Sequence, residues 1–279
     1  MDKDQLIDFA EKLHQEAFDA NAYLLIMQQY RENWKEYQAE MRLSPAFYSV
    51  VYVALQKACF IELAKLYDRT NGAYSIGTLL KKCQENPSYF SEYRDKVEIE
   101  DDGKKYIFPV HYQRELKPAE ECFFKEEVNL QREFYKFFDL PDADKVPVTV
   151  DLTFSKFLEL YRKRYKALSK KRDNLSEQRN KLYAHNDEKS IFNIDEILKK
   201  NPLFYADIKE FIEFALDVTG LIIAALTGVC KAEKYSNIDD WMGTLMLARL
   251  GLKYQKYDCE QREKEFWDEF NSWEKEKTR

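Results

Sequence analysis

Glycine and proline are scarce in this chain, and their positions limit what it can fold into. The 279 residues include seven Gly and seven Pro, and neither type occurs in residues 1–44 or in residues 148–201. Both residues interrupt helices and mark turns, so long stretches without them favour long helices. Apolar residues such as Leu6, Phe9 and Leu13 recur at helical spacing. The sequence therefore predicts an all-α fold, an up-and-down helical bundle.

Composition narrows the class of protein further. Hydrophobic residues make up 45% and charged residues 34%, which is typical of an ordinary globular protein. The five cysteines are scattered without a C-x-x-C pair, so we expect free thiols in a reducing compartment. The three histidines lack metal-ligand spacing, and we expect neither a metal nor another cofactor. The N-terminus is charged and the apolar run Val218–Cys230 is too short to span a bilayer, which predicts a cytoplasmic protein without membrane contact.

Turn signals divide the chain into four segments. Five of the seven prolines fall within residues 87–148, and Asp102-Gly103 separates two short alternating runs there, which predicts an inserted segment with a small β-hairpin. A helix from Pro118 to Phe138 is expected to follow the hairpin. The predicted segments are an N-terminal helix (1–43), a bundle (44–86 and 149–230), the insertion (87–148) and two C-terminal helices (231–279), the second from Asp258 to Lys277.

One predicted helix, from Asp151 to about His185, is strongly basic although the whole chain has a net charge of −6. Nine basic and two acidic residues lie between Tyr161 and Lys181. Every seventh residue along this helix is apolar, which predicts a buried seam made of Phe154, Tyr161, Leu168, Leu175 and Leu182. A companion row begins apolar and turns to arginine: Leu158, Tyr165, Arg172 and Arg179.

Two residues near the end of this helix suit phosphate chemistry. In a regular helix Arg179 and His185 each lie roughly 60° from Leu182, on opposite sides, so both flank the inward face. Histidine titrates near neutral pH, and arginine can bind a phosphate with two hydrogen bonds. Along one helix the two lie about 9 Å apart, so they meet at one phosphate only if the helix ends near His185 or a second copy contributes.

The other polar residues of this region leave alternatives open. Lys170, Lys171, Arg172 and Lys181 are candidates for a phosphate-binding track, or they pair with the acidic C-terminal helix. Arg179 is alternatively a packed arginine whose charge is neutralised by Asp173 or Glu177. Asp68 either supports the site through its turn or only ends a helix.

The segment Arg179-Asn180-Lys181-Leu182-Tyr183-Ala184-His185 resembles the motif of the HEPN superfamily, which is Arg, a polar residue, four to six residues and then His. The segment Leu63–Leu80, a helix ending in an Asp-containing turn followed by a short Ser-Ile-x-x-Leu-Leu helix, is similar to the abortive-infection AbiU-like branch. The resemblance covers residues 44–86 and 150–230.

This resemblance implies a function and its residues. It implies a metal-independent endoribonuclease in which two copies pair and hold RNA between them, possible roles being phage defence or a toxin, with an antitoxin or regulatory protein as a further partner. His185 would transfer the proton when the ribose 2′-hydroxyl attacks phosphorus, Arg179 would stabilise the charge, and Asn180 would orient a group. The alternative is a non-catalytic helical module that binds RNA or another protein.

Overall fold

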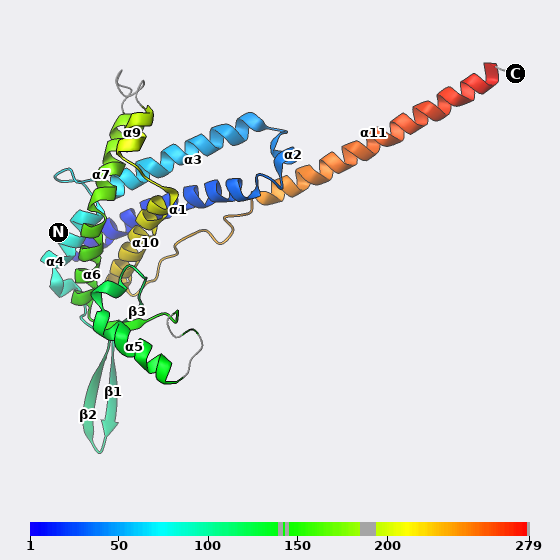
Figure 1. Cartoon of the computed structure of the whole chain (residues 1–279). Helices are drawn as coiled ribbons and strands as arrows, with labels where there is room; N and C mark the ends of the chain where they lie inside the picture. The colour runs from blue at the N-terminus through cyan, green and yellow to red at the C-terminus, as the bar shows by residue number, and fades with distance from the viewer. Residues whose placement is uncertain (139–141, 143–144, 185–193, 278–279) are drawn as a thin grey trace. The chain divides into compact units, whose positions relative to one another are not determined.

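The structure is a computed structural model that describes residues 1–138, 142, 145–184 and 194–277, without the side chains of 182–184 and 275–277. Within these residues helices dominate, and the strands form two two-stranded sheets (Figure 1). The predicted all-α class with a small hairpin in an insertion is therefore confirmed. The chain forms two compact units, the first from residues 1–20 and 60–233 and the second from residues 21–59 and 234–279. The four predicted segments stay predictions.

The first unit is built around one apolar helix. In α10 (Tyr205–Thr227), Phe211, Phe214 and Val218 are completely buried. The helix ends before Gly228, whose φ of 75° suits glycine. Around it lie the start of α1 and the end of α3, together with shorter helices of the same unit (Figure 1). The bounds are α1 Lys3–Asn33, α3 Pro45–Leu66, α4 Ile76–Glu85, α6 Phe154–Ala167, α7 Ser169–Gln178 and α9 Ile194–Lys200.

The basic segment is not the single helix that we predicted. Its first residues form strand β4 (Thr149–Leu152), in which Val150 and Leu152 are buried and their neighbours exposed, an alternation that favours a strand. Thr153 then caps α6, and the helix breaks at Leu168 before α7 begins. The four apolar residues of the predicted seam whose side chains are described are all buried: Phe154, Tyr161, Leu168 and Leu175.

The segment that carries Arg179 has a wider helical turn than expected. Residues Arg179–Ala184 form a π-helical turn, η3, directly after α7. Such turns occur mostly as single-turn bulges within α-helices, frequently at functional sites, and they change the angle between successive side chains. The regular-helix angles that we assumed between Arg179 and Leu182 therefore do not apply here.

The insertion contains two pairs of antiparallel strands and one helix. Strands β1 and β2 form the predicted hairpin, which turns through Asp102 (φ 49°) and Gly103 (φ 72°), as a tight two-residue turn requires. Strand β3 pairs with β4. The helix predicted from Pro118 begins later, at Lys125. The bounds are β1 Asp95–Asp101, β2 Lys104–Val110, β3 Tyr112–Glu115, α5 Lys125–Phe137, and the short helices η1 Pro87–Tyr89 and η2 Glu121–Phe123.

A buried ionic cluster ties the insertion to α6 and α10. Arg114 of β3 donates to both carboxylate oxygens of Asp217, at 2.9 and 2.7 Å, and to Glu120 at 2.7 Å. Arg164 lies 2.8 Å from the fully buried Glu120, and the Tyr161 hydroxyl donates to Asp217 at 2.8 Å. Each charge in the cluster thus faces an opposite charge, which a buried ion requires.

The second unit combines the end of α1, the start of α3, the short helix α2 (Gln38–Met41) and α11 (Met242–Lys277). Tyr30, Tyr37, Met41 and Leu245 form its buried cluster. The first predicted helix, which we placed at residues 1–43, ends earlier, at Asn33. The two helices that we predicted after residue 230 are one helix, α11. A helix can run from Met242 to Lys277 because this segment contains no proline. Its two glycines, Gly243 and Gly251, lower the stability of the helix but do not break the helix.

Helix α3 is long and apolar. Within the described residues it is the one helix long and apolar enough to cross a bilayer, with 22 residues and a mean hydropathy of 1.3. Helices of proteins without membrane segments meet the same criterion, so a single such helix does not make a membrane protein. The predicted cytoplasmic location stays a prediction.

Candidate functional site

A small polar cavity lies where the turn after α3 meets α7 and the π-helical turn. Its volume is about 180 Å³. On one side are Tyr67 and the turn Asp68–Thr70, and on the other are the side chains of α7 and η3. The polar residues of the second side are Arg172, Ser176, Arg179 and Asn180.

Two arginines give this cavity its chemistry. The side chain of Arg172 is only 8% exposed, and its guanidinium carbon lies 3.8 Å from the centre of the Tyr165 ring. The Nε atoms of Arg172 and Arg179 are both buried, and neither has a hydrogen-bond partner among the described residues. A buried N–H group without an acceptor is costly, so the two Nε atoms favour a ligand with acceptor oxygens in the cavity.

The carboxylates nearest in sequence to Arg179 are engaged elsewhere. Asp173 pairs with Arg69, which ties the turn after α3 to α7. Glu177 pairs with Lys181 at 2.6 Å. Neither of the two acids that we considered as partners of Arg179 therefore shows an ion pair with it.

Asp68 is the carboxylate of the cavity. Its Oδ1 accepts hydrogen bonds from the backbone nitrogen of Thr70 at 2.8 Å and from the Thr70 hydroxyl at 2.7 Å. Burial works to raise the pKa of Asp68, but the Thr70 hydrogen bonds and the charge of Arg179 outweigh it and the pKa is lowered. Asp68 is therefore ionised at neutral pH, and the cavity combines two positive charges with one negative charge.

A comparison with known protein families finds a family of the superfamily that the motif around Arg179 resembles. The model of the HEPN family AbiU2 matches residues 3–243, which is most of the chain. The chain belongs to the HEPN AbiU2 family. The family match takes in the first helix and the insertion, which our resemblance left out, and it ends as α11 begins. Comparisons with curated proteins and with solved structures gave no match.

The structure brings together some of the predicted HEPN site residues. Arg179, Asn180 and Arg172 line the same cavity. Lys170 is exposed, whereas Lys171 pairs with Asp207 at 2.6 Å and Glu210 at 2.5 Å. Both partners of Lys171 thus lie in α10 and not in the acidic C-terminal helix. His185 lies outside the described residues.

Several residues of the candidate site were not predicted from the sequence. Ser176 and Thr70 line the cavity, and Asn174 and Gln178 hold α7 in place. The last two are buried and donate to the carbonyl oxygens of Pro202 and Asn201, at 2.9 and 2.6 Å. The available signal in the sequence was two amide side chains four residues apart on a charged helix, close to the predicted seam. Such groups need hydrogen-bond partners when they are buried.

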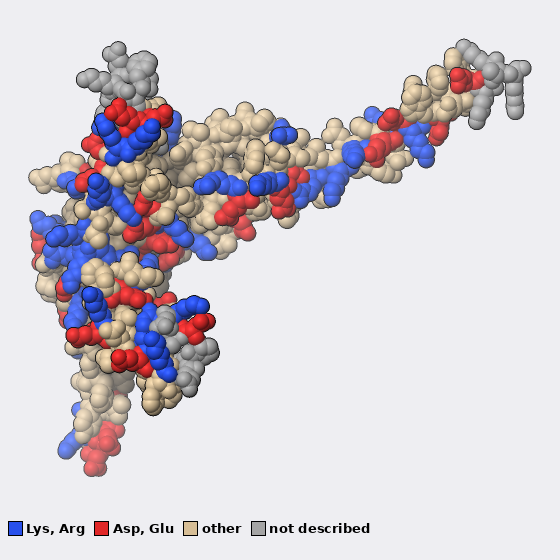
Figure 2. All heavy atoms as spheres, in the orientation of Figure 1, with Lys and Arg blue, Asp and Glu red and all other residues tan. Residues whose placement is uncertain are grey.

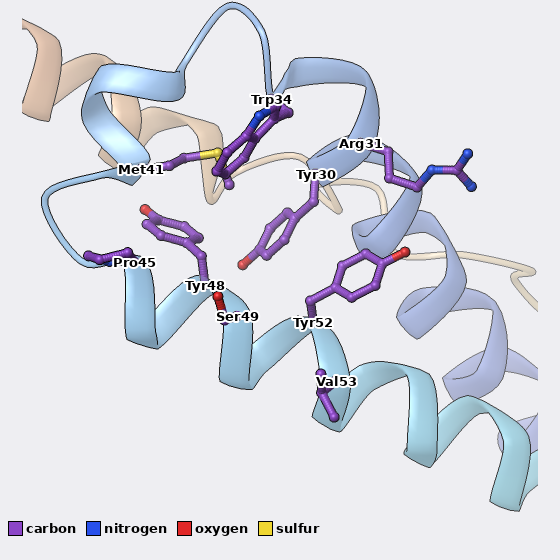
Figure 3. Close-up of a pocket in the computed structure, with 9 residues that line it drawn as sticks. All are labelled: Tyr30, Arg31, Trp34, Met41, Pro45, Tyr48, Ser49, Tyr52 and Val53. Atoms are coloured by element: carbon purple, nitrogen blue, oxygen red, sulfur yellow. The ribbon is translucent and has the colours of Figure 1, made fainter. Parts of the chain in front are cut away.

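Other chemistries find less support in the described residues. No group of three or more His, Cys, Asp or Glu side chains there is arranged to hold a metal ion. The second unit contains an apolar cavity of about 410 Å³, lined mainly by the rings of Tyr30, Trp34, Tyr48 and Tyr52 (Figure 3). In Figure 3 the guanidinium of Arg31 points away from these rings. That cavity is suited to apolar groups, so we place the candidate site at the paired arginines.

Proposed function

We propose that this HEPN protein is a metal-independent endoribonuclease. The observation that supports the proposal best is the pair of arginines, Arg172 and Arg179, whose buried Nε atoms meet at one cavity without a partner among the described residues. Guanidinium groups bind phosphate strongly and keep their charge at any physiological pH. The cavity therefore fits the phosphate at which an RNA chain is cut.

The proposed reaction is an internal transfer at phosphorus. The ribose 2′-oxygen forms a bond to phosphorus while the bond from phosphorus to the 5′-oxygen breaks, which leaves a cyclic phosphate and a 5′-hydroxyl. One base removes the 2′-hydroxyl proton and one acid delivers a proton to the leaving 5′-oxygen, and we assign His185 to this proton transfer. Arg179 stabilises the additional negative charge on the phosphate oxygens as they crowd around phosphorus.

The assembly and the biological setting form part of the same proposal. The motif of each chain contains one histidine and so supplies one proton-transfer group, and a homodimer that joins two copies of the motif would supply the acid and the base together. Membership of an abortive-infection family supports a role in phage defence or as a toxin. An antitoxin or regulatory protein that restrains cleavage would then be a partner.

Cleavage of mixed RNA in EDTA by the full chain tests the proposal. Wild type is compared with Arg179→Ala, His185→Ala and the control Arg262→Ala, which removes an exposed arginine of α11. We expect the control to cleave like wild type and the two motif variants to lose at least about a hundredfold in rate. Equal rates in all four proteins would refute the catalytic proposal, and RNA binding without cleavage would favour the non-catalytic module.

A further inference from the structure

We propose that the trough between α4 and α6 binds the phosphates of single-stranded RNA next to the scissile position. This inference rests on the proposed function, because it extends the substrate beyond the arginine cavity. The trough has a volume of about 490 Å³. In Figure 2 basic side chains gather over α4 and α6.

Two helical stripes face each other across this trough. Arg162, Lys163 and Lys166 of α6 lie on one face of their helix, since they are three and four residues apart. On α4 the corresponding face carries Gly77, Leu80 and Lys81. The buried Leu80 contributes an apolar floor, so the charged groups stand along the two rims.

Half of the cations that line the trough have no carboxylate partner among the described residues. Four cations line it (Lys81, Arg162, Lys163 and Lys166), and Glu159 is its one acidic lining residue. Glu159 pairs with Lys163 at 2.7 Å and Glu85 pairs with Lys81 at 3.8 Å, while Arg162 and Lys166 form no ion pair with the described residues. Exposed cations without protein partners are suited to a polyanion whose binding releases counterions.

Tyr165 connects the trough with the arginine cavity. Its side chain lines the trough, and its ring supports the guanidinium of Arg172 and stacks on Tyr67 with centroids 6.2 Å apart. Arg172 and Tyr67 both line the cavity. Tyr165 therefore contacts lining residues of both spaces, and in our proposal a strand whose phosphate occupies the cavity continues along the trough.

The approach of α4 to α6 that creates the trough depends on a glycine. A β-carbon at Gly77 would lie 2.6 Å from the Tyr165 hydroxyl oxygen and 3.0 Å from the ring carbon that bears it. Any larger residue would push Tyr165 or α4 aside. Gly77 thus allows both the trough and the placement of Tyr165 against Arg172.

Fluorescence anisotropy with a labelled single-stranded RNA in EDTA tests this inference. The full chain is compared with Arg162→Glu/Lys166→Glu and with a control of equal charge change, Lys104→Glu/Lys105→Glu, in the exposed strand β2. We expect the trough variant to bind at least about tenfold more weakly and to lower the slope of log affinity against log salt by about 1.4. Glu159→Gln, which removes the acidic group, should bind RNA more tightly than wild type.

The outcomes separate this inference from the proposed function. The trough proposal would be overturned if the trough variant bound RNA as tightly as wild type, or if the control lost as much RNA affinity. It would also be overturned if the trough variant lost affinity only for an acidic peptide, used as a second probe. Cleavage of a dinucleotide, which reaches only the cavity, should persist in the trough variant. If wild type cleaves no RNA at all, the endoribonuclease proposal fails while the anisotropy comparison still decides the trough.

Discussion

The guanidinium carbon of Arg172 lies 3.8 Å from the centre of the Tyr165 ring, so this arginine packs on α6 while it lines the polar cavity. A cation over an aromatic face is stabilised by the ring, but that contact leaves the guanidinium without an acceptor for its Nε. The position of Arg172 is thus fixed by packing, and its Nε has no acceptor among the described residues.

Replacing Arg172 with methionine should separate these two roles. Methionine keeps an apolar stem but removes the buried charge, so we expect thermal stability without ligand to be unchanged or higher. In wild type, a single-stranded RNA at ten times its dissociation constant should stabilise the fold by about 1.4 kcal/mol. Thermal unfolding should show most of that gain lost in Arg172→Met, and an undiminished gain would contradict the role of Arg172.

Gly77→Ala should destabilise the first unit by about 1–3 kcal/mol, because its β-carbon collides with the Tyr165 hydroxyl. Removing that hydroxyl in Gly77→Ala/Tyr165→Phe should recover part of the loss. Urea unfolding of both single variants and the double variant gives the coupling energy between the two positions. Additive losses would mean that α4 and α6 do not meet as described.

Asp68→Asn should strengthen RNA binding by roughly two- to fivefold. The lowered pKa of Asp68 means that it carries a full negative charge beside Arg179 at neutral pH, which opposes a phosphate in the cavity. Asparagine keeps the oxygen that accepts from Thr70, so the turn should be preserved. Titration of labelled RNA at neutral pH measures the change, and weaker binding would show that Asp68 mainly positions Arg179.

The buried cluster around Asp217 should make the fold sensitive to acid. Burial works to raise the pKa of Asp217, but the hydrogen bonds and charge of Arg114 outweigh it and the pKa is lowered from its usual 3.8. A lowered folded-state pKa contributes stability that is present above the unfolded pKa and is lost as pH falls through the folded pKa. That loss should therefore occur below about pH 4.

Asp217→Asn provides the measurement for this cluster. It leaves Arg114 and Arg164 to share the carboxylate of Glu120 and should cost about 3–5 kcal/mol at neutral pH, since one buried positive charge then has no partner. Urea unfolding of wild type and variant over a pH series should show the difference shrinking in acid. A difference that is constant down to the lowest pH would contradict the assigned role of the Asp217 carboxylate.

The helices could be predicted from the sequence because local signals agree with the packing. Asp102-Gly103 turns the hairpin as expected, and the ordinary helix-start signals Ser44-Pro45 and Ser75 directly precede or begin α3 and α4. The buried seam of α6 and α7 followed from its seven-residue spacing. The strand β4 was missed because an alternation over only four residues is a weak signal directly before a helix, and pairing with β3 selects the strand.

The candidate site was only partly predictable for a different reason. Arg179 and Asn180 were found through a local motif, whereas the turn Asp68–Thr70 reaches them only through the fold. The burial of Arg172 depends on Tyr165, and the π-helical turn η3 has no simple sequence signal. Lys171 was a candidate for a phosphate-binding track or for pairing with the C-terminal helix, but its partners Asp207 and Glu210 lie in α10.

The chemistry at the cut end of the RNA tests the central claim most directly. Mass spectrometry of the fragments made in EDTA should show a 2′,3′-cyclic phosphate on one end and a 5′-hydroxyl on the other for wild type. The same products should be absent for Arg179→Ala and present for Arg262→Ala. Fragments ending in a 3′-hydroxyl, or equal amounts of cyclic phosphate from Arg179→Ala, would contradict an arginine-assisted attack by the 2′-oxygen.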